Sequence, residues 1–366
     1  MLKVREGTIL TTKDREEWDR LVQGTPCRDV FFRPDYARLF ESLSGDGARA
    51  FLFGEASDYV IYPFFLRRVN DLPFFRARPL DGETVYHDIV SPYGYSGPLA
   101  RLSHPEREEA LWRGFLAAFH AYCQETRIVC EFARLNPFVG NHRPLQALTE
   151  GVTAASTIVC VDLRQSPAEI WRGLNRGNRS NIHKARQHGV TIRTGAEAAW
   201  VERFYALYVE TMRRNEASEW YYFSPTFFAD TFALLHGKVT LLSAWYEDEM
   251  IAAASFLHDG DAVHYFLGGS ASERLELRPN NLLMYEAICW ARAQGYRWFN
   301  LGGGYHPGDN LSRFKAGFSE LSMTFYTYRA VHDVALYAEL NARHRAYQQA
   351  MGQPQGDGHY FPQYRS

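Results

Sequence analysis

The sequence has few lysines, no paired-cysteine motif and no long apolar run. Only five of its 40 basic residues are lysine, so a lysine in this chain is more informative than usual. The five cysteines are odd in number and show no CxxC spacing, which indicates buried thiols in a reducing compartment. No stretch reaches the ~20 apolar residues that span a bilayer, and no apolar run of signal-peptide length follows the N-terminus. We therefore expect a cytoplasmic protein without an integral membrane segment.

The net charge and the length limit how the protein could bind nucleic acid and how many domains it has. The formal net charge of −2 is too small to make the whole surface attract a polyanion, so a nucleic-acid contact would need a local basic patch. The chain has 366 residues, of which 46% are hydrophobic and 15% aromatic, enough to fill two modest cores. The sequence therefore predicts two domains.

An internal echo indicates that these two domains share one fold. Residues 51–66 and 241–257 each have the pattern of a β-hairpin around a polar turn, and their starts lie about 190 residues apart. An amphipathic helix and then a strand follow each hairpin, at residues 106–124 and 128–132 in the first half and at 282–294 and 296–301 in the second. A fold duplication explains this order.

The second half gives the fold class. It adds a third strand at 262–268 and a last strand at 321–328, so several antiparallel strands precede a crossover helix, which is an α+β order. We expect a first domain at 1–150, completed by a C-terminal helix at 331–350, and a second domain at 151–330. The tail at 352–366 is rich in Gly, Pro and Gln, which predicts flexibility unless its Tyr and Phe residues dock.

A basic helix begins the second half. Ser166, Pro167 and Glu169 form a capping-box pattern, so we expect a helix from Pro167 towards Gln187. This helix carries a dense positive strip: Arg172, Arg176, Arg179, Lys184 and Arg186. Arginine suits phosphate oxygens, so the strip is a candidate site for a polyanionic substrate. A solvated helix face is the alternative interpretation.

A glycine loop and a lysine follow the strand at 296–301. Gly302, Gly303 and Gly304 can approach a ligand closely, but Pro307 and the missing G-x-G-x-x-G spacing argue against a dinucleotide site. Downstream, Lys315 falls off the apolar face of a short predicted helix. A fixed ammonium beside a carbonyl oxygen can stabilise the negative charge that develops in acyl transfer. A plain turn and a solvated lysine are the alternatives.

These segments together resemble the FemABX family. The resemblance rests on the run from Arg179 to Val190, the helix that starts near Asn281, the three glycines from Gly302, and the Phe314-Lys315 pair. It extends into the first half through residues 91–99 and 132–136. The family consists of aminoacyl-tRNA-dependent transferases built from two tandem GNAT-like (acyl-CoA N-acyltransferase-like) domains with mixed, mostly antiparallel sheets.

The resemblance implies a function and a site. It assigns the stabilisation of the tetrahedral intermediate to Lys315, and it implies the acceptor end of an aminoacyl-tRNA as co-substrate, with no cofactor and no metal. The acceptor would be an amine of a peptidoglycan precursor, a peptide or a natural product. The expected substrate-binding residues are Arg179, Lys184, Arg186, Gly303, Gly304, Tyr305, Asn281, Phe314 and Tyr265.

Two other functions remain open. The first is a CoA-dependent GNAT N-acyltransferase with acyl-CoA as donor, although the start of the central helix at 277–283 lacks the glycines that usually bind the CoA pyrophosphate. The second is a non-catalytic binding module, which predicts an eroded glycine loop and Phe-Lys pair. A covalent enzyme intermediate is not expected, since the sequence has no G-x-S-x-G elbow. Asp309, His306 and Glu320 are candidate bases, and Tyr296 and Trp298 are candidate stacking residues beside Tyr265.

Overall fold

The computed structural model describes residues 7–366 apart from 56, 81–82, 305–308, 355 and 357–359. It divides into two compact units, the first made of residues 1–155 and 325–366 and the second of residues 156–324. Both dividing points fall inside long strands, β7 (Val152–Asp162) and β13 (Ser322–Val331). No helix in the described ranges is long and apolar enough to cross a membrane.

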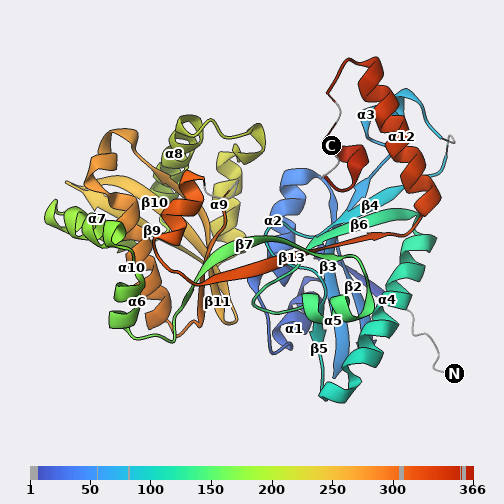
Figure 1. Cartoon of the computed structure of the whole chain (residues 1–366), viewed down its shortest axis with the longest axis horizontal. Helices are drawn as coiled ribbons and strands as arrows, with labels where there is room; N and C mark the ends of the chain where they lie inside the picture. The colour runs from blue at the N-terminus through green and yellow to red at the C-terminus, as the bar shows by residue number, and fades with distance from the viewer. Residues whose placement is uncertain (1–6, 56, 81–82, 305–308, 355, 357–359) are drawn as a thin grey trace. The chain divides into compact units, whose positions relative to one another are not determined.

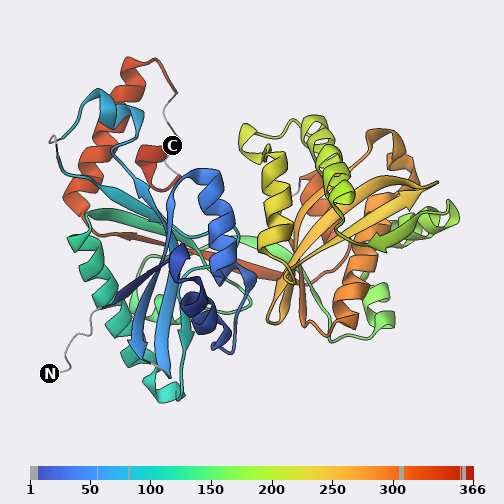
Figure 2. The ribbon, with the colours of Figure 1, turned by 180° about the vertical axis from the view of Figure 1, so that it is seen from behind.

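The first unit is a sheet with helices on both faces. Its elements are β1 (Thr8–Thr11), α1 (Arg15–Gln23), α2 (Pro34–Ser44), β2 (Gly47–Glu55), β3 (Asp58–Arg68), α3 (Pro73–Ala77), β4 (His87–Val90), β5 (Leu99–Arg101), α4 (Glu108–Glu125), β6 (Ile128–Arg134), α5 (His142–Leu148) and α12 (Val334–Ala350). The strand order is β1-β2-β3-β4-β6-β13, and β4 and β6 are its parallel pair. Helix α4 lies on the face turned to the viewer in Figure 1, and α1 and α2 lie on the face seen in Figure 2.

Aromatic side chains fill the core of this unit. Phe51 and Phe64, from the hairpin β2–β3, contact Phe119 of α4 with ring centroids 5.0 and 5.8 Å apart, and Phe115 stacks on Phe119 at 5.7 Å. Ring contacts of this kind stabilise a core beyond the area that they bury.

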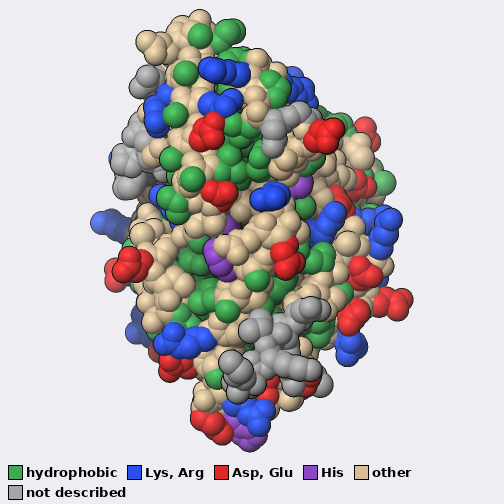
Figure 3. Space-filling view, turned by 90° about the vertical axis from the view of Figure 1, so that its right-hand side faces the viewer, with side chains coloured by type: hydrophobic (Ala, Val, Ile, Leu, Met, Phe, Trp, Pro, Cys, Tyr) green, Lys and Arg blue, Asp and Glu red, His purple; other side chains and the backbone are tan. Residues whose placement is uncertain are grey.

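The surface of this unit on the side of α4 and α12 shows Lys and Arg interspersed with Asp and Glu, without a broad area of one sign (Figure 3).

The second unit has the same kind of layers. Its elements are α6 (Pro167–Gly173), α7 (Arg176–Gln187), β8 (Thr191–Thr194), α8 (Ala198–Arg214), α9 (Pro225–Leu234), β9 (Val239–Tyr246), β10 (Glu249–Asp259), β11 (Ala262–Ser270), α10 (Pro279–Ala293), β12 (Trp298–Gly302) and α11 (Asn310–Ala316). The strand order is β7-β12-β11-β10-β9-β8, and β11 and β12 are its parallel pair. Helices α8 and α9 lie on one face of this sheet and α10 on the other (Figures 1 and 2).

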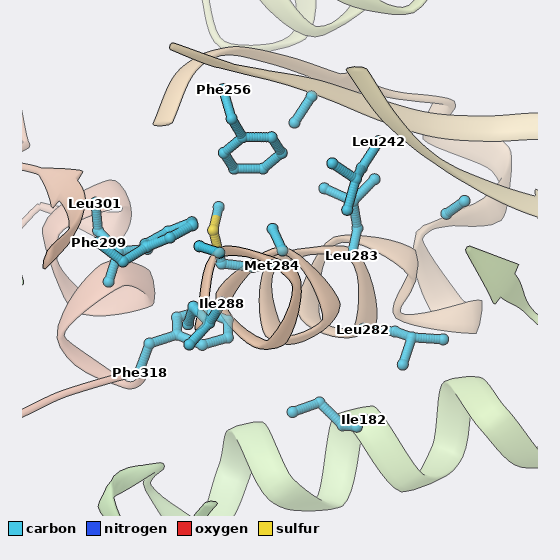
Figure 4. Close-up of a cluster of buried hydrophobic side chains, with 14 of the residues drawn as sticks. Ile182, Leu242, Phe256, Leu282, Leu283, Met284, Ile288, Phe299, Leu301 and Phe318 are labelled. Carbon is cyan, nitrogen blue, oxygen red and sulfur yellow. The ribbon is translucent and has the colours of Figure 1, made fainter. Parts of the chain in front are cut away.

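Helix α10 supplies the centre of the second core (Figure 4). Its buried residues Leu282, Leu283, Met284 and Ile288 face different neighbours, among them Ile182 of α7 and the aromatic rings of the sheet. Pro279 begins the helix at a position that needs no hydrogen-bonded N–H, and Gly295, with φ of 85°, follows its end. The helix is therefore fixed from both ends between the sheet and α7.

The two units repeat one order of elements. The first reads β1-α1-α2-β2-β3-β4-α4-β6, where α3 and the short β5 are additions, and the second reads β8-α8-α9-β9-β10-β11-α10-β12. In each, an antiparallel hairpin precedes a third strand, and a helix crosses over to a strand parallel to that third strand. The predicted α+β fold with two tandem domains and mostly antiparallel sheets is confirmed.

The basic helix differs from the prediction, because it is two helices. Its capping box at Ser166 and Glu169 is present, but α6 ends at Gly173 and α7 begins at Arg176. Asn175 makes the break: its side chain accepts a hydrogen bond from the Asn178 amide at 2.7 Å, and its own amide donates to the Gly317 carbonyl at 2.9 Å. Because Gly317 is distant in sequence, the periodicity of residues 167–187 could not reveal this break.

The last residues of the tail dock on the first unit through a tyrosine. Tyr364 is 1% exposed and donates a hydrogen bond to Asp88 at 3.0 Å, and Arg365 binds the same carboxylate at 2.6 Å. Arg67 contributes a third contact to Asp88, at 2.6 Å. Residues 360–366 are therefore docked on the first unit by a buried charge network, and the docking of Tyr364 is the exception that the sequence analysis allowed for a flexible tail.

Candidate functional site

Lys315 lies near the C-terminal end of α11. This short helix is started by Asp309, whose side chain accepts a hydrogen bond from the Ser312 amide at 2.6 Å. Phe314 and Phe318 meet edge to face at 5.2 Å and attach the helix to the core. Lys315 itself is only 7% exposed, although the sequence placed it off the apolar face of the helix. A lysine is rarely buried to this extent unless its amine has a partner.

The amine of Lys315 has two neighbours from different strands. Its Nζ donates a hydrogen bond to the Gly303 carbonyl at 2.7 Å, just past the end of β12. It also lies 5.5 Å from the ring centroid of Tyr265 on β11, within cation–π range. Gly302 has φ of 76°, and a Cβ atom there would lie 3.2 Å from Nζ. A glycine at this position thus provides both the backbone turn and the space for the amine.

Burial sets the charge of this amine. Removal from water lowers the pKa of Lys315 to about 8, and the Asp309 carboxylate opposes part of that shift. The amine is thus mostly protonated at neutral pH, but it loses its proton more readily than an exposed lysine. A desolvated ammonium of this kind can stabilise a developing oxyanion more strongly than a solvated one.

The site opens where two parallel strands stop pairing. Strands β11 and β12 pair from Ala262 with Trp298 to His264 with Asn300, and within residues 262–304, all of which are described, no later pair joins them. Tyr265 follows the last paired residue of β11, and Gly302 and Gly303 follow that of β12. We call residues 264–268 and 300–303 the strand fork. The side chains of its first pair also meet, with Asn300 Nδ2 3.0 Å from His264 Nδ1.

The chain is similar to known proteins in sequence over part of its length and in fold over most of it. Residues 174–316 match the family described as acetyltransferase (GNAT) domain. The crystal structure of FemX is similar over 92% of this chain and 99% of that chain, with a TM-score of 0.68 and 14% sequence identity. The chain has the fold of FemX. A conserved protein of unknown function from Bacteroides thetaiotaomicron VPI-5482 is also similar, at a TM-score of 0.53 and 12% identity over 88% of this chain and 98% of that one. No curated protein matches in sequence.

These comparisons confirm the resemblance in fold to FemX. The residues that match the acetyltransferase (GNAT) domain family, 174–316, all lie in the second unit. The strand fork and Lys315 lie within the same matched range.

The other predicted residues of the loop have different positions. Gly303 contacts the lysine through its carbonyl, whereas Gly304 is exposed and lies against the Asp309 side chain. Phe314 packs on the hydrophobic core as a half-buried residue. Tyr305 and His306 lie outside the described residues. The structure thus brings together Lys315, Tyr265 and Gly303 from the predicted set.

Asn281 joins two helices. It is 8% exposed, and its Nδ2 donates to Oδ1 of Asn178 on α7 at 2.9 Å. Because Asn175 of the same segment binds the Gly317 carbonyl, the start of α7 contacts both α10 and the end of α11. Asn281 thus holds the start of α10 against α7.

The predicted basic residues occupy different environments on α7. Arg179 donates hydrogen bonds to the carbonyls of Arg172 and Leu174, so its guanidinium caps the C-terminal end of the neighbouring helix α6. Arg186 forms an ion pair with Glu286 at 2.7 Å. Lys184, like Arg176, is exposed. Arg186 is exposed as well but is already paired, so a phosphate contact on this helix would fall first to Arg176 and Lys184.

His264 and Asn300 were not among the residues predicted from the sequence. Each is a polar residue inside an apolar strand, which is the only signal that the sequence gives for them. Both prove to be 2% exposed in the folded unit. The candidate stacking residues Tyr296 and Trp298 are engaged elsewhere, Tyr296 with His258 at 2.8 Å and Trp298 with arginine side chains. Within the described ranges, no group of three His, Cys, Asp or Glu residues is placed to hold a metal ion.

Proposed function

We propose that this chain transfers an amino acid from aminoacyl-tRNA to an amine of a peptidoglycan precursor, a peptide or a natural-product acceptor. The observation that carries the proposal is the buried ammonium of Lys315 at the strand fork of an acyltransferase-type domain. The fold shared with FemX supports the tandem arrangement in which such a site would operate.

The proposed reaction is direct attack without an acyl-enzyme. The acceptor nitrogen attacks the ester carbonyl carbon, the new C–N bond forms, and the C–O bond to the terminal ribose breaks. The proton that the nitrogen loses ends on the ribose hydroxyl. Lys315 would stabilise the oxyanion between these steps. Cys160 is no rival nucleophile in this unit, because burial raises its pKa to about 12.

The start of α10 supports a donor other than CoA. Ordinary GNAT enzymes bind a pyrophosphate with backbone amides at this position. Here Pro279 has no N–H, the Arg278 amide donates to Leu275, and the Asn281 amide donates to Arg278. Few amides therefore remain for a pyrophosphate at this helix end.

A CoA-dependent N-acyltransferase is the second candidate. The match of residues 174–316 to the acetyltransferase (GNAT) domain family favours it. It uses the same fork and the same lysine, since a thioester carbonyl develops the same negative charge under attack by an amine. The two candidates differ only in the group that leaves.

The donor that is consumed decides between them. The protein would be incubated with a pool of charged tRNAs and, separately, with short acyl-CoAs, each with a mixture of amine acceptors. We expect deacylation of tRNA above the spontaneous rate, new amide product, and no release of CoA thiol. Thiol release with amide formation would overturn the tRNA donor. Consumption of neither donor would overturn the proposed transferase.

A further inference from the structure

The first pair of the strand fork is joined by a side-chain hydrogen bond. Asn300 Nδ2 lies 3.0 Å from His264 Nδ1. These two residues are the last that pair between β11 and β12, and the strand fork begins with them. Both residues are 2% exposed. In a dry environment this bond is costly to break, because each polar group would lose its partner without gaining water.

The second atom of the Asn300 amide fixes the direction of that bond. Its Oδ1 accepts a hydrogen bond from the Gly302 amide at 2.8 Å. The amide nitrogen must therefore face His264, and since an amide nitrogen only donates, His264 Nδ1 is the acceptor. The imidazole consequently carries its proton on Nε2. One amide thus determines both the turn at Gly302 and the tautomer of the histidine.

The two groups that contact the Lys315 amine each follow one member of this pair along the chain. Tyr265, whose ring lies under the amine, directly follows His264 on β11. Gly303, whose carbonyl binds the amine, follows the turn that Asn300 holds on β12. A change in the separation of the two strands at this point would move the ring and the carbonyl relative to one another.

We propose that His264 and Asn300 are positioning residues that hold the strand fork at the width in which the Lys315 ammonium meets its acyl carbonyl. They act through Tyr265 and through the Gly302–Gly303 turn, and they do not touch the substrate. The catalytic consequence rests on the proposed function, but the effect on the lysine itself does not. Misplacement of a catalytic group by about 1 Å can reduce a rate by two orders of magnitude.

The pKa of Lys315 gives a direct readout. With only five lysines in the chain, lysine labelled with carbon-13 at Cε gives few NMR signals. Lys315→Arg assigns the signal of interest by its loss. His264→Leu removes the hydrogen bond between residue 264 and Asn300, so we expect the two strands to separate and water to reach the Lys315 amine. The pKa of Lys315 should then rise by about one unit towards that of an exposed lysine. Donor consumption should fall roughly ten- to a hundredfold in kcat.

Two further variants separate positioning from general damage. His264→Asn places an oxygen where Nδ1 was, which keeps an acceptor for Asn300, so it should restore most of the lost rate and the original pKa. His258→Leu removes another buried histidine, one that binds Thr240 and Tyr296 on the same sheet. It should lower stability as His264→Leu does, but leave the Lys315 pKa in place.

The outcomes distinguish the two hypotheses. An unchanged Lys315 pKa in folded His264→Leu would overturn the positioning role, whatever the activity. A shifted Lys315 pKa in His264→Leu, together with an unchanged transfer rate when Lys315 itself is substituted, would leave the positioning role intact and overturn the catalytic proposal. Equal shifts in His264→Leu and His258→Leu would also overturn the positioning role, since the effect would then be general.

Discussion

The two units repeat one topology, yet their equivalent strand ends differ. In the first unit the parallel strands β4 and β6 stay joined past their regular pairing: the Ser91 amide donates to Phe132 at 2.9 Å and the Ser96 amide to Arg134 at 2.8 Å. In the second unit pairing stops at His264 and Asn300. The repeated framework therefore has a closed strand end in the first unit and an open one in the second.

The residues after these strands follow the same contrast. In the first unit, Asn141 donates through Nδ2 to the carbonyls of Ser96 and Pro98 and accepts from the Asn136 amide, so its polar atoms bind the chain itself. The second unit has glycines and Lys315 at the corresponding place. Polar atoms that bind one another stabilise a fold, whereas a buried ammonium against one carbonyl retains bonding capacity for a ligand. We infer that the first fork is structural and the second chemical.

Removal of the lysine charge tests this contrast most strongly. Lys315→Met keeps the length of the side chain but makes the second fork uncharged. We expect kcat for amide formation to fall by about 10²–10³-fold, the range seen when one oxyanion donor is lost. Lys238→Met is the matched control, because Lys238 lies in the same unit and pairs with Asp259. A rate within threefold of the unchanged protein would remove Lys315 from the chemistry.

Damage to the closed fork should affect stability instead. Asn141→Ala leaves the carbonyls of Ser96 and Pro98 and the Asn136 amide without partners in a buried place. Each buried group that loses its partner costs up to about 3 kcal/mol. We therefore expect denaturant unfolding to show a fall of at least about 1 kcal/mol in the free energy of unfolding. Asn215→Ala, at the exposed end of α8, should stay within about 0.5 kcal/mol. A loss of transfer in folded Asn141→Ala without loss of stability would contradict a purely structural first fork.

The pH dependence of the open fork follows from the pKa of Lys315, which is about 8. The amine is charged below this pH and neutral above it, so a reaction that needs the ammonium should lose kcat above pH 8, by about tenfold per unit. In Lys315→Arg the guanidinium stays charged, so any remaining activity should persist to higher pH. A kcat that continues to rise through pH 9 would instead indicate that the neutral amine acts as a base.

Sequence patterns predicted the framework well, because hairpins and amphipathic helices are local features. Alternation at residues 51–66 and 241–257 was enough for both hairpins. The chemistry of Lys315 suggested it as a candidate, but its burial depends on Tyr265 and Gly303, which only the folded sheet brings to it. His264 and Asn300 resemble chance polar residues in apolar strands until their register places them opposite each other. The break at Asn175 likewise depends on Gly317.

The smallest expected effect lies on α7, which has no basic counterpart in the repeated elements of the first unit. Because Arg179 and Arg186 are engaged with the protein, we expect a tRNA phosphate to meet Arg176 and Lys184, which are both exposed. Arg176→Glu with Lys184→Glu should raise KM for the donor several-fold at low salt, with kcat unchanged. The difference should shrink as salt increases, because released counterions contribute less to binding. Lys13→Glu reverses an exposed lysine of the first unit and should change neither parameter. A salt-independent effect, or an equal one from Lys13→Glu, would return α7 to the role of a solvated helix face and would leave Lys315 as the cation that matters for transfer.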